Sequence, residues 1–190
     1  MAVRPAVPAD HPAVADVVTR AFGEDGTTVA GLVEALRTSG HVRAELVAEA
    51  GRGSARAVAG HVLLSRSWVD ARRALVEVLV LSPLSVAPEL HGRGLGTELL
   101  GAAVAAARGL GAPALFREGD PAFYSGRGFE PATPRGFLRP SPRIPEPAFQ
   151  VVVLDTHEEW MTGPLVYCDP FWAHDCVGLR DPLLGRLEGS

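Results

Sequence analysis

The sequence predicts a mixed α/β fold, a twisted sheet of about seven strands with helices on both faces. The first observation is an apolar strand, 74–81, that runs into a glycine-rich loop and then an alanine- and leucine-rich helix, 94–108. The second is another apolar strand, 112–117, which we expect to be parallel to the first because a helix crosses between them. The third is a pair of strands in hairpin order, 45–49 and 57–65, with a turn over 51–54.

The other segments fit the same architecture. A short first strand, 3–6, precedes two helices, the first ending near residue 22 and the second covering about 28–38, each with one apolar face. A strand after Phe129, a proline-rich loop and an all-apolar strand, 149–154, complete the sheet. We therefore assign one domain to residues 1–155. The aromatic extension, 156–190, has no strong period and is expected to pack on the domain or on a partner subunit, which makes a homodimer possible.

Composition limits the function. The 190 residues are 47% hydrophobic and 21% charged, enough for a substantial core. No apolar run approaches the roughly 20 residues that span a bilayer, and the first residues carry no secretion signal, so we expect a cytoplasmic protein without a membrane partner. The net charge of −4 argues against nucleic acid as the main partner. The spacing of Cys168, His174 and Cys176 fits no standard zinc site, so no metal is expected.

The segment that carries chemistry is the glycine loop, residues 91–97, which opens the helix 94–108. The first N–H groups of a helix have no internal partners and favour negative charge, so such a loop suits a phosphate. It is not a dinucleotide fingerprint, because Thr97 or Leu99 stands where the last glycine would be required. It is not a Walker loop either, because the chain has no lysine. A helix start that happens to be glycine-rich is the simpler alternative.

Two motifs resemble one known family. Val86 is followed by His91-Gly92-Arg93-Gly94-Leu95-Gly96, and Gly119-Asp120-Pro121-Ala122-Phe123-Tyr124 leads to Gly128-Phe129. Their order and spacing are similar to the acetyl-CoA signature, Gln/Arg-x-x-Gly-x-Gly/Ala, and the later tyrosine segment of the GNAT superfamily of N-acetyltransferases. His91 departs from the usual Gln or Arg, although the glycines that form the backbone cradle are present.

The resemblance implies acetyl-CoA as cosubstrate and direct transfer of acetyl to an amine. In that family the strand bends at the position of Pro83, where regular pairing also ends because proline has no N–H. The arm of the cosubstrate then pairs with the strand, and the loop holds the pyrophosphate. The implied cofactor-binding residues are Leu84, Val86, His91, Gly92, Arg93, Gly94, Leu95, Gly96 and Thr97.

Two residues are candidate catalytic groups. The resemblance makes Tyr124 the general acid for the departing thiolate, and a tyrosine packed at a helix end is the alternative. Glu77 is the odd carboxylate in a strand with two mainly apolar faces, so it is paired, solvated in a cleft or raised in pKa. It is a candidate general base, directly or through water, or the partner of Arg66, Arg72 or Arg73 in a salt bridge.

The sequence therefore indicates an acyl-CoA-dependent N-acetyltransferase that acts on a primary amine of a small molecule or a peptide N-terminus. Glu24 and Asp25 are candidates to contact a cationic acceptor amine. The alternative is that they form a solvated acidic turn. A non-catalytic module that binds acetyl-CoA or CoA is the alternative, favoured by His91. A binding protein that uses the aromatic extension as its interface is the third hypothesis.

Overall fold

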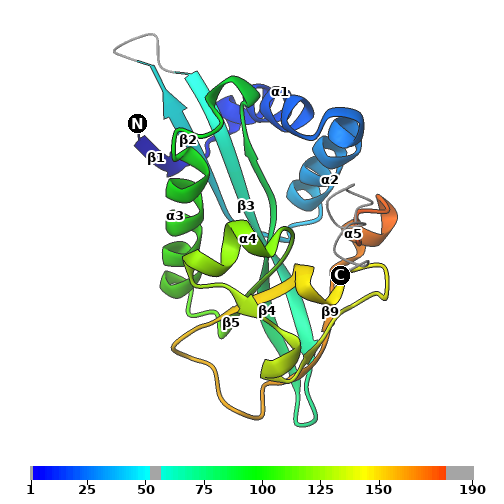
Figure 1. The fold of residues 1–190 in the computed structure, drawn as a ribbon. Coiled ribbons are helices and arrows are strands. Elements are labelled where there is room, and N and C mark those ends of the chain that lie inside the picture. Colours follow the sequence, from blue (N-terminus) through cyan, green and yellow to red (C-terminus); the bar gives the residue numbers. More distant parts are fainter. Residues whose placement is uncertain (1, 52–56, 179–190) are drawn as a thin grey trace. The chain divides into compact units, whose positions relative to one another are not determined.

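A computed structural model describes residues 2–51 and 57–178 (Figure 1). The chain divides into two compact units: the first holds Met1–Ser65 and Leu81–Ala106, and the second holds Arg66–Val80 and Ala107–Ser190. The strands β3 (Ala57–Asp70) and β4 (Leu75–Val86) run through both units. The described residues form a nine-stranded sheet with the order β1-β2-β3-β4-β5-β8-β6, to which β7 and β9 are joined. This confirms the predicted mixed α/β class.

In the first unit, β1 (Ala2–Pro5) and β3 both pair antiparallel with β2 (Val42–Ala50). The predicted hairpin is therefore confirmed, although positions 52–54 of its expected turn lie outside the described residues. Helices α1 (His11–Phe22) and α2 (Gly26–Thr38) pack side by side (Figure 1). Their approach needs Gly26, because a side chain there would collide with the carbonyl oxygen of Thr19.

Helices of the first unit cover both faces of its strands. A methyl group added at Gly60 of β3 would come within 2.8 Å of Leu99, which belongs to α3 (Leu95–Gly109). The next residue, His61, points to the opposite face because side chains alternate along a strand. There it contacts Glu45, which in turn binds Arg37 of α2. Helices α3 and α2 therefore lie on opposite faces.

Hydrogen bonds of Glu45 fasten α2 to the sheet. His61 Nε2 lies 2.8 Å from Glu45 Oε1, and Arg37 Nε donates to Glu45 Oε2 at 3.2 Å. Burial raises the pKa of Glu45, but the hydrogen bonds from His61 and Arg37 outweigh it and lower the pKa to about 2. Burial also lowers the pKa of His61. His61 is therefore a structural residue of the core.

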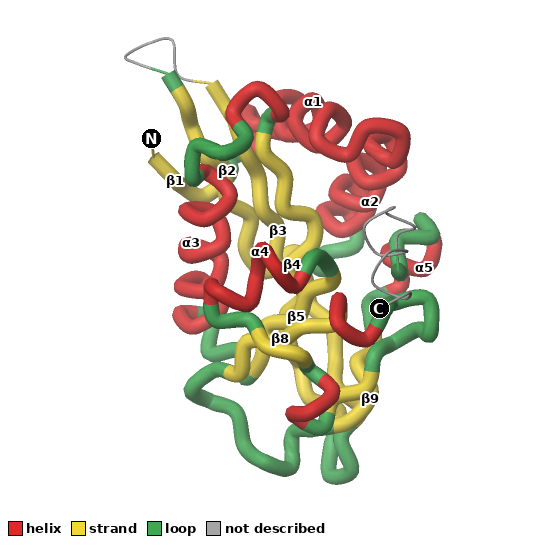
Figure 2. The backbone as a smooth tube through the Cα atoms, in the orientation of Figure 1, coloured by secondary structure: helices red, strands yellow, loops and turns green. Residues whose placement is uncertain are grey.

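In the second unit, β5 (Ala114–Glu118) is parallel to β4, with Leu79 opposite Leu115 and Val80 opposite Phe116, as predicted. On its other edge β5 pairs antiparallel with β8 (Phe149–Val153), which also pairs with β6 (Glu130–Pro131) (Figure 2). The short helix α4 (Pro121–Tyr124) follows β5. The described part of the chain holds no helix of the length and apolarity that a membrane crossing needs.

The extension after residue 155 has structure that the sequence pattern did not predict. Its strand β9 (Gly163–Val166) pairs with Trp68 and Val69 of β3 and with β7 (Phe137–Leu138). A helix, α5 (Asp169–Ala173), follows. The aromatic rings of Tyr167 and Phe171 are buried in this unit, while Trp172 is 45% exposed. A homodimer through this extension stays a prediction.

A buried carboxyl joins β5 to the extension. Glu118 Oε1 accepts a hydrogen bond of 2.6 Å from the Tyr167 hydroxyl, and Oε2 accepts one of 3.0 Å from Gly178 N–H. Burial is the main influence on this carboxyl, and it raises the pKa of Glu118 from its ordinary 4.5 to about 7. Two hydrogen bonds to the charged form oppose this shift without cancelling it.

This raised pKa predicts that the charge of Glu118 destabilises the protein at neutral pH. Between pH 4.5 and 7 the folded protein holds the proton of Glu118 that the unfolded chain releases, so this group's stabilisation is lost as the pH rises. Relative to wild type, Glu118→Gln should therefore become more stable as the pH rises from 5 to 7, by about 2 kcal/mol. Urea unfolding at both pH values measures this difference.

The prediction compares Glu118→Gln with wild type at each pH. This is needed because the lowered pKa of His61 makes the stability of both proteins rise with pH over part of the same range. Glu146→Gln, at an exposed glutamate of the same unit, is the matched control and should follow wild type. Equal pH dependence in wild type and Glu118→Gln would contradict the prediction.

Candidate active site

The glycine loop follows β4 in the first unit. After Val86 comes a 3-10 turn, Pro88–Leu90, which an ion pair of 3.0 Å between Arg20 and Glu89 fastens to α1. Gly92 and Gly94 have φ angles of 73° and 86°, a left-handed conformation that side chains rarely adopt. A methyl group added at either would meet nothing within 4 Å. These glycines are therefore required by backbone conformation, and open space lies beside them.

Helix α3 starts directly after this loop. Its first helical hydrogen bond runs from Glu98 N–H to the Gly94 carbonyl, at 3.0 Å. The N–H groups of Leu95 and Gly96 precede that bond, so the helix itself does not use them. Arg93 in the loop is exposed and forms no ion pair with the residues that the structure describes. Unused amides beside a cationic side chain suit a phosphate group.

His91 ties the loop back to the strand. Its Nε2 lies 2.9 Å from the Val86 carbonyl oxygen, to which it donates a hydrogen bond in the appropriate tautomer. The departure at this position, a histidine where Gln or Arg is usual, therefore has a local structural role. The same bond occupies a carbonyl on the part of β4 that was predicted to pair with the arm of the cosubstrate.

The strand residues predicted to hold that arm are half-buried. Leu84 and Val86 alternate with the buried Pro83 and Ser85. The strand itself continues through Pro83, where the sequence predicted an end of regular pairing. In the described residues, however, the pairing of β4 with β5 covers only Leu79 and Val80. The backbone of Leu84 and Val86 therefore lies beyond this pairing.

Tyr124 occupies the last position of α4 in the second unit. Asp120 begins this helix, as predicted, by accepting a hydrogen bond of 2.9 Å from Ala122 N–H. The Tyr124 side chain packs edge-on against Phe123 and Phe129, with ring centres 4.6 and 5.7 Å away. The residue is 7% exposed, and its hydroxyl makes no hydrogen bond with the described residues. The packed tyrosine that the sequence allowed is therefore present, and the role of Tyr124 as general acid stays a prediction.

Glu77 does not lie on a covered face. Its side chain is 48% exposed and lies 3.9 Å from Arg66 Nη1, so the salt-bridge alternative from the sequence is present. The start of β4 is open because Leu75, two residues earlier, is also 60% exposed. The apolar alternation predicted burial here, but nothing in the pattern distinguishes a strand's exposed end from its covered middle.

The sequence analysis missed two charged residues of β5. Arg117 is buried and Glu118 is half-buried, and the guanidinium carbon of Arg117 lies 3.2 Å from the centre of the Tyr124 ring. The signal that would have found them is a charged pair at the end of an otherwise apolar strand, just before Gly119 and Asp120.

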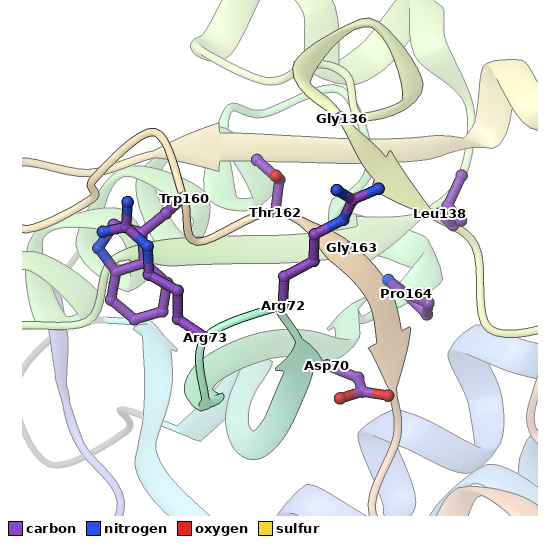
Figure 3. Close-up of a pocket in the computed structure, with 9 residues that line it drawn as sticks. All are labelled: Asp70, Arg72, Arg73, Gly136, Leu138, Trp160, Thr162, Gly163 and Pro164. Carbon is purple, nitrogen blue, oxygen red and sulfur yellow. The ribbon is translucent and has the colours of Figure 1, made fainter.

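A pocket of about 500 Å³ lies within the second unit, apart from the residues discussed above (Figure 3). The turn between β3 and β4 supplies Arg72 and Arg73, and Arg73 lies 5.6 Å from the ring centre of Trp160. None of the predicted site residues lines it. Its wall consists of Asp70, Arg72, Arg73, Gly136, Leu138, Trp160, Thr162, Gly163 and Pro164.

Cys168 and Cys176 are buried free thiols. Burial raises the pKa of Cys168 to about 12, so this thiol is protonated at neutral pH. Within the described ranges, no three His, Cys, Asp or Glu side chains are grouped so that they could hold a metal ion. The thiols therefore belong to the packing of the second unit.

Comparison with known proteins agrees with this geometry. Residues 19–129 match the model of the acetyltransferase (GNAT) family. The chain is 31% identical over 163 residues to the uncharacterized N-acetyltransferase YjhQ of Escherichia coli K12, covering 83% of this chain and 86% of that protein. It is 32% identical over 172 residues to the uncharacterized N-acetyltransferase YhbS of the same strain, covering 90% and 98%.

Solved structures show the same fold. The crystal structure of E. coli YhbS in complex with CoA has a TM-score of 0.75 at 30% identity, over 90% of this chain and 91% of that one. A GNAT family acetyltransferase from Brucella melitensis, in complex with acetyl-CoA, has a TM-score of 0.70 at 24% identity, over 90% and 97%. The family model covers more than half of this chain, and a relative above 30% identity covers nearly all of it. The protein belongs to the GNAT family of acetyltransferases.

Proposed function

We propose that this protein transfers the acetyl group of acetyl-CoA to a primary amine, either of a small molecule or of a peptide N-terminus. Membership of the GNAT family makes it an acyl-CoA-dependent acetyltransferase. The observation that carries the proposal is the left-handed backbone at Gly92 and Gly94, which directly precedes α3. The E. coli relative YhbS, 30% identical, was crystallised with CoA.

The loop is assigned to the pyrophosphate of acetyl-CoA. The amides of Gly92 to Thr97 would donate to the phosphate oxygens. The exposed cation of Arg93, which has no ion pair with any described residue, supports the same assignment. His91 keeps the loop on the end of β4 through its bond to Val86. The backbone of Leu84 and Val86 is assigned to the pantetheine arm.

The reaction breaks the thioester C–S bond and forms a C–N bond. The amine loses a proton and the sulfur gains one, so the protein needs a base and an acid. Tyr124 is proposed as the acid because its ring is fixed by packing and its hydroxyl has no partner among the described residues. Glu77, or a water that it orders, is proposed as the base, and its exposure leaves it open to water.

The loop assignment predicts that Gly94→Ala weakens CoA binding about tenfold. Alanine disfavours the left-handed conformation by about 1–2 kcal/mol, so the free loop leaves this conformation and must return to it when CoA binds. Titration calorimetry with CoA measures this. Gly101→Ala is the matched control because it adds the same methyl group, also in open space, inside α3. The control should keep its affinity and gain about 0.5–1 kcal/mol of stability. Equal CoA affinity in the two variants would contradict the assignment.

The acid assignment predicts that Tyr124→Phe lowers kcat about 100-fold or more, while CoA affinity stays within about twofold of wild type. Release of CoA in the presence of an amine library measures turnover. Tyr167→Phe is the control because Tyr167 is the other of the chain's two tyrosines and binds Glu118. Turnover that survives in Tyr124→Phe would remove Tyr124 from the mechanism. CoA binding by wild type without turnover on any amine would favour the non-catalytic module.

A further inference from the structure

Arg117 is a buried arginine that has no hydrogen-bonded partner in the described part of the chain. It is 7% exposed, and its Nε and Nη1 atoms are buried with no acceptor among the residues that the structure describes. Burial is the main influence on the guanidinium and lowers the pKa of Arg117 to about 9, so the side chain is charged at neutral pH. Burying a cation without a partner is unfavourable. Packing alone therefore does not explain why this cation is buried.

The shape of the second unit directs this guanidinium onto Tyr124. The Arg117 Cζ atom lies 3.2 Å from the centre of the Tyr124 ring. Gly119 also lies against this guanidinium, because any side chain there would collide with Arg117 Nη2. The absence of a side chain at Gly119 therefore leaves room for the guanidinium beside the aromatic ring.

The other charged groups near Tyr124 are engaged elsewhere. Glu118 accepts its hydrogen bonds from Tyr167 and Gly178, and Asp120 caps α4 through Ala122. Arg127 lies over the neighbouring ring of Phe123, at 4.2 Å. Glu118 and Asp120 influence Arg117 through their charge without a direct hydrogen bond. Among the described residues, Arg117 is therefore the cation that faces the Tyr124 ring.

We propose that Arg117 is a positioning residue that makes the Tyr124 hydroxyl a stronger acid. A positive charge held against the ring in a desolvated setting stabilises the phenolate relative to the phenol. In the reaction, Tyr124 passes its proton to the CoA sulfur, and the negative charge left on its oxygen is stabilised by Arg117. The inference rests on the proposed role of Tyr124 as the general acid.

Titration of the tyrosines tests this without using turnover. The chain has two tyrosines, so protein labelled with ¹³C at tyrosine Cζ gives two NMR signals, and Tyr124→Phe identifies the one from Tyr124. In Arg117→Met the titration midpoint of Tyr124 should rise by about one pH unit, a tenfold weaker acid. The matched control Arg127→Met removes the neighbouring arginine–aromatic contact and should leave that midpoint unchanged.

Arg117→Lys keeps the positive charge and serves as a second variant in case Arg117→Met does not fold. It should keep the Tyr124 midpoint nearer to wild type than to Arg117→Met, and an increase as large as in Arg117→Met would overturn the role of charge. If Arg117→Met does not fold, a Tyr124 midpoint in Arg117→Lys that stays within about 0.3 of a pH unit of wild type supports the proposal. An unchanged Tyr124 midpoint in folded Arg117→Met overturns it.

Kinetics add a second readout. Arg117→Met should lower kcat about tenfold, keep the KM for acetyl-CoA within about twofold, and move the basic limb of the pH–rate profile upward. A higher KM for the amine with an unchanged Tyr124 midpoint would overturn the proposal and make Arg117 a contact of the acceptor. The two proposals can fail separately. Turnover in Tyr124→Phe would show that Tyr124 is not the general acid. The shift of the Tyr124 titration midpoint in Arg117→Met depends only on the Arg117 and Tyr124 side chains and not on turnover.

Discussion

The parallel pairing of β4 and β5 is the constraint from which the candidate site follows. Parallel neighbours cannot be joined by a tight turn, so the chain must leave the end of β4, cross over and return. The crossover here is α3, and its N-terminus therefore follows the carboxyl end of β4 after a short connection. Gly92 and Gly94 make that connection possible because they adopt a left-handed backbone. An anion-binding helix start is thus a consequence of the topology.

The two units differ in how far hydrogen bonds offset the burial of charged groups. In the first, Glu45 is ionised because His61 and Arg37 both donate to it, and the group fastens a helix to a strand. In the second, Glu118 has two donors, yet burial dominates and its pKa is raised. Arg117 beside it has no ion-pair partner among the described residues. Our proposal is that this cation, which has no direct partner among the described residues, acts on the neighbouring Tyr124.

Much of the fold could be predicted because its signals are local. The α3 crossover, the parallel β5 and the Asp120 cap of α4 all follow from short stretches of sequence. Strand β9 was not predicted because it is short, contains Pro164 and is held in an extended conformation by pairing with β3. The exposure of Glu77 escaped prediction for a related reason: whether a strand end is covered depends on what packs there, and alternation does not encode this.

The sequence by itself determined the order of the elements from β1 to α4, the glycine positions of the loop and the place of Tyr124 at the end of a short helix. Those features depend on backbone preferences and on residues a few positions apart. Only the tertiary structure decided that Arg117 lies on the Tyr124 ring and that Glu118 binds a backbone amide 60 residues later. The physical reason is that the state of a buried charge depends on desolvation and on partners distant in sequence, which exist only once the core has formed.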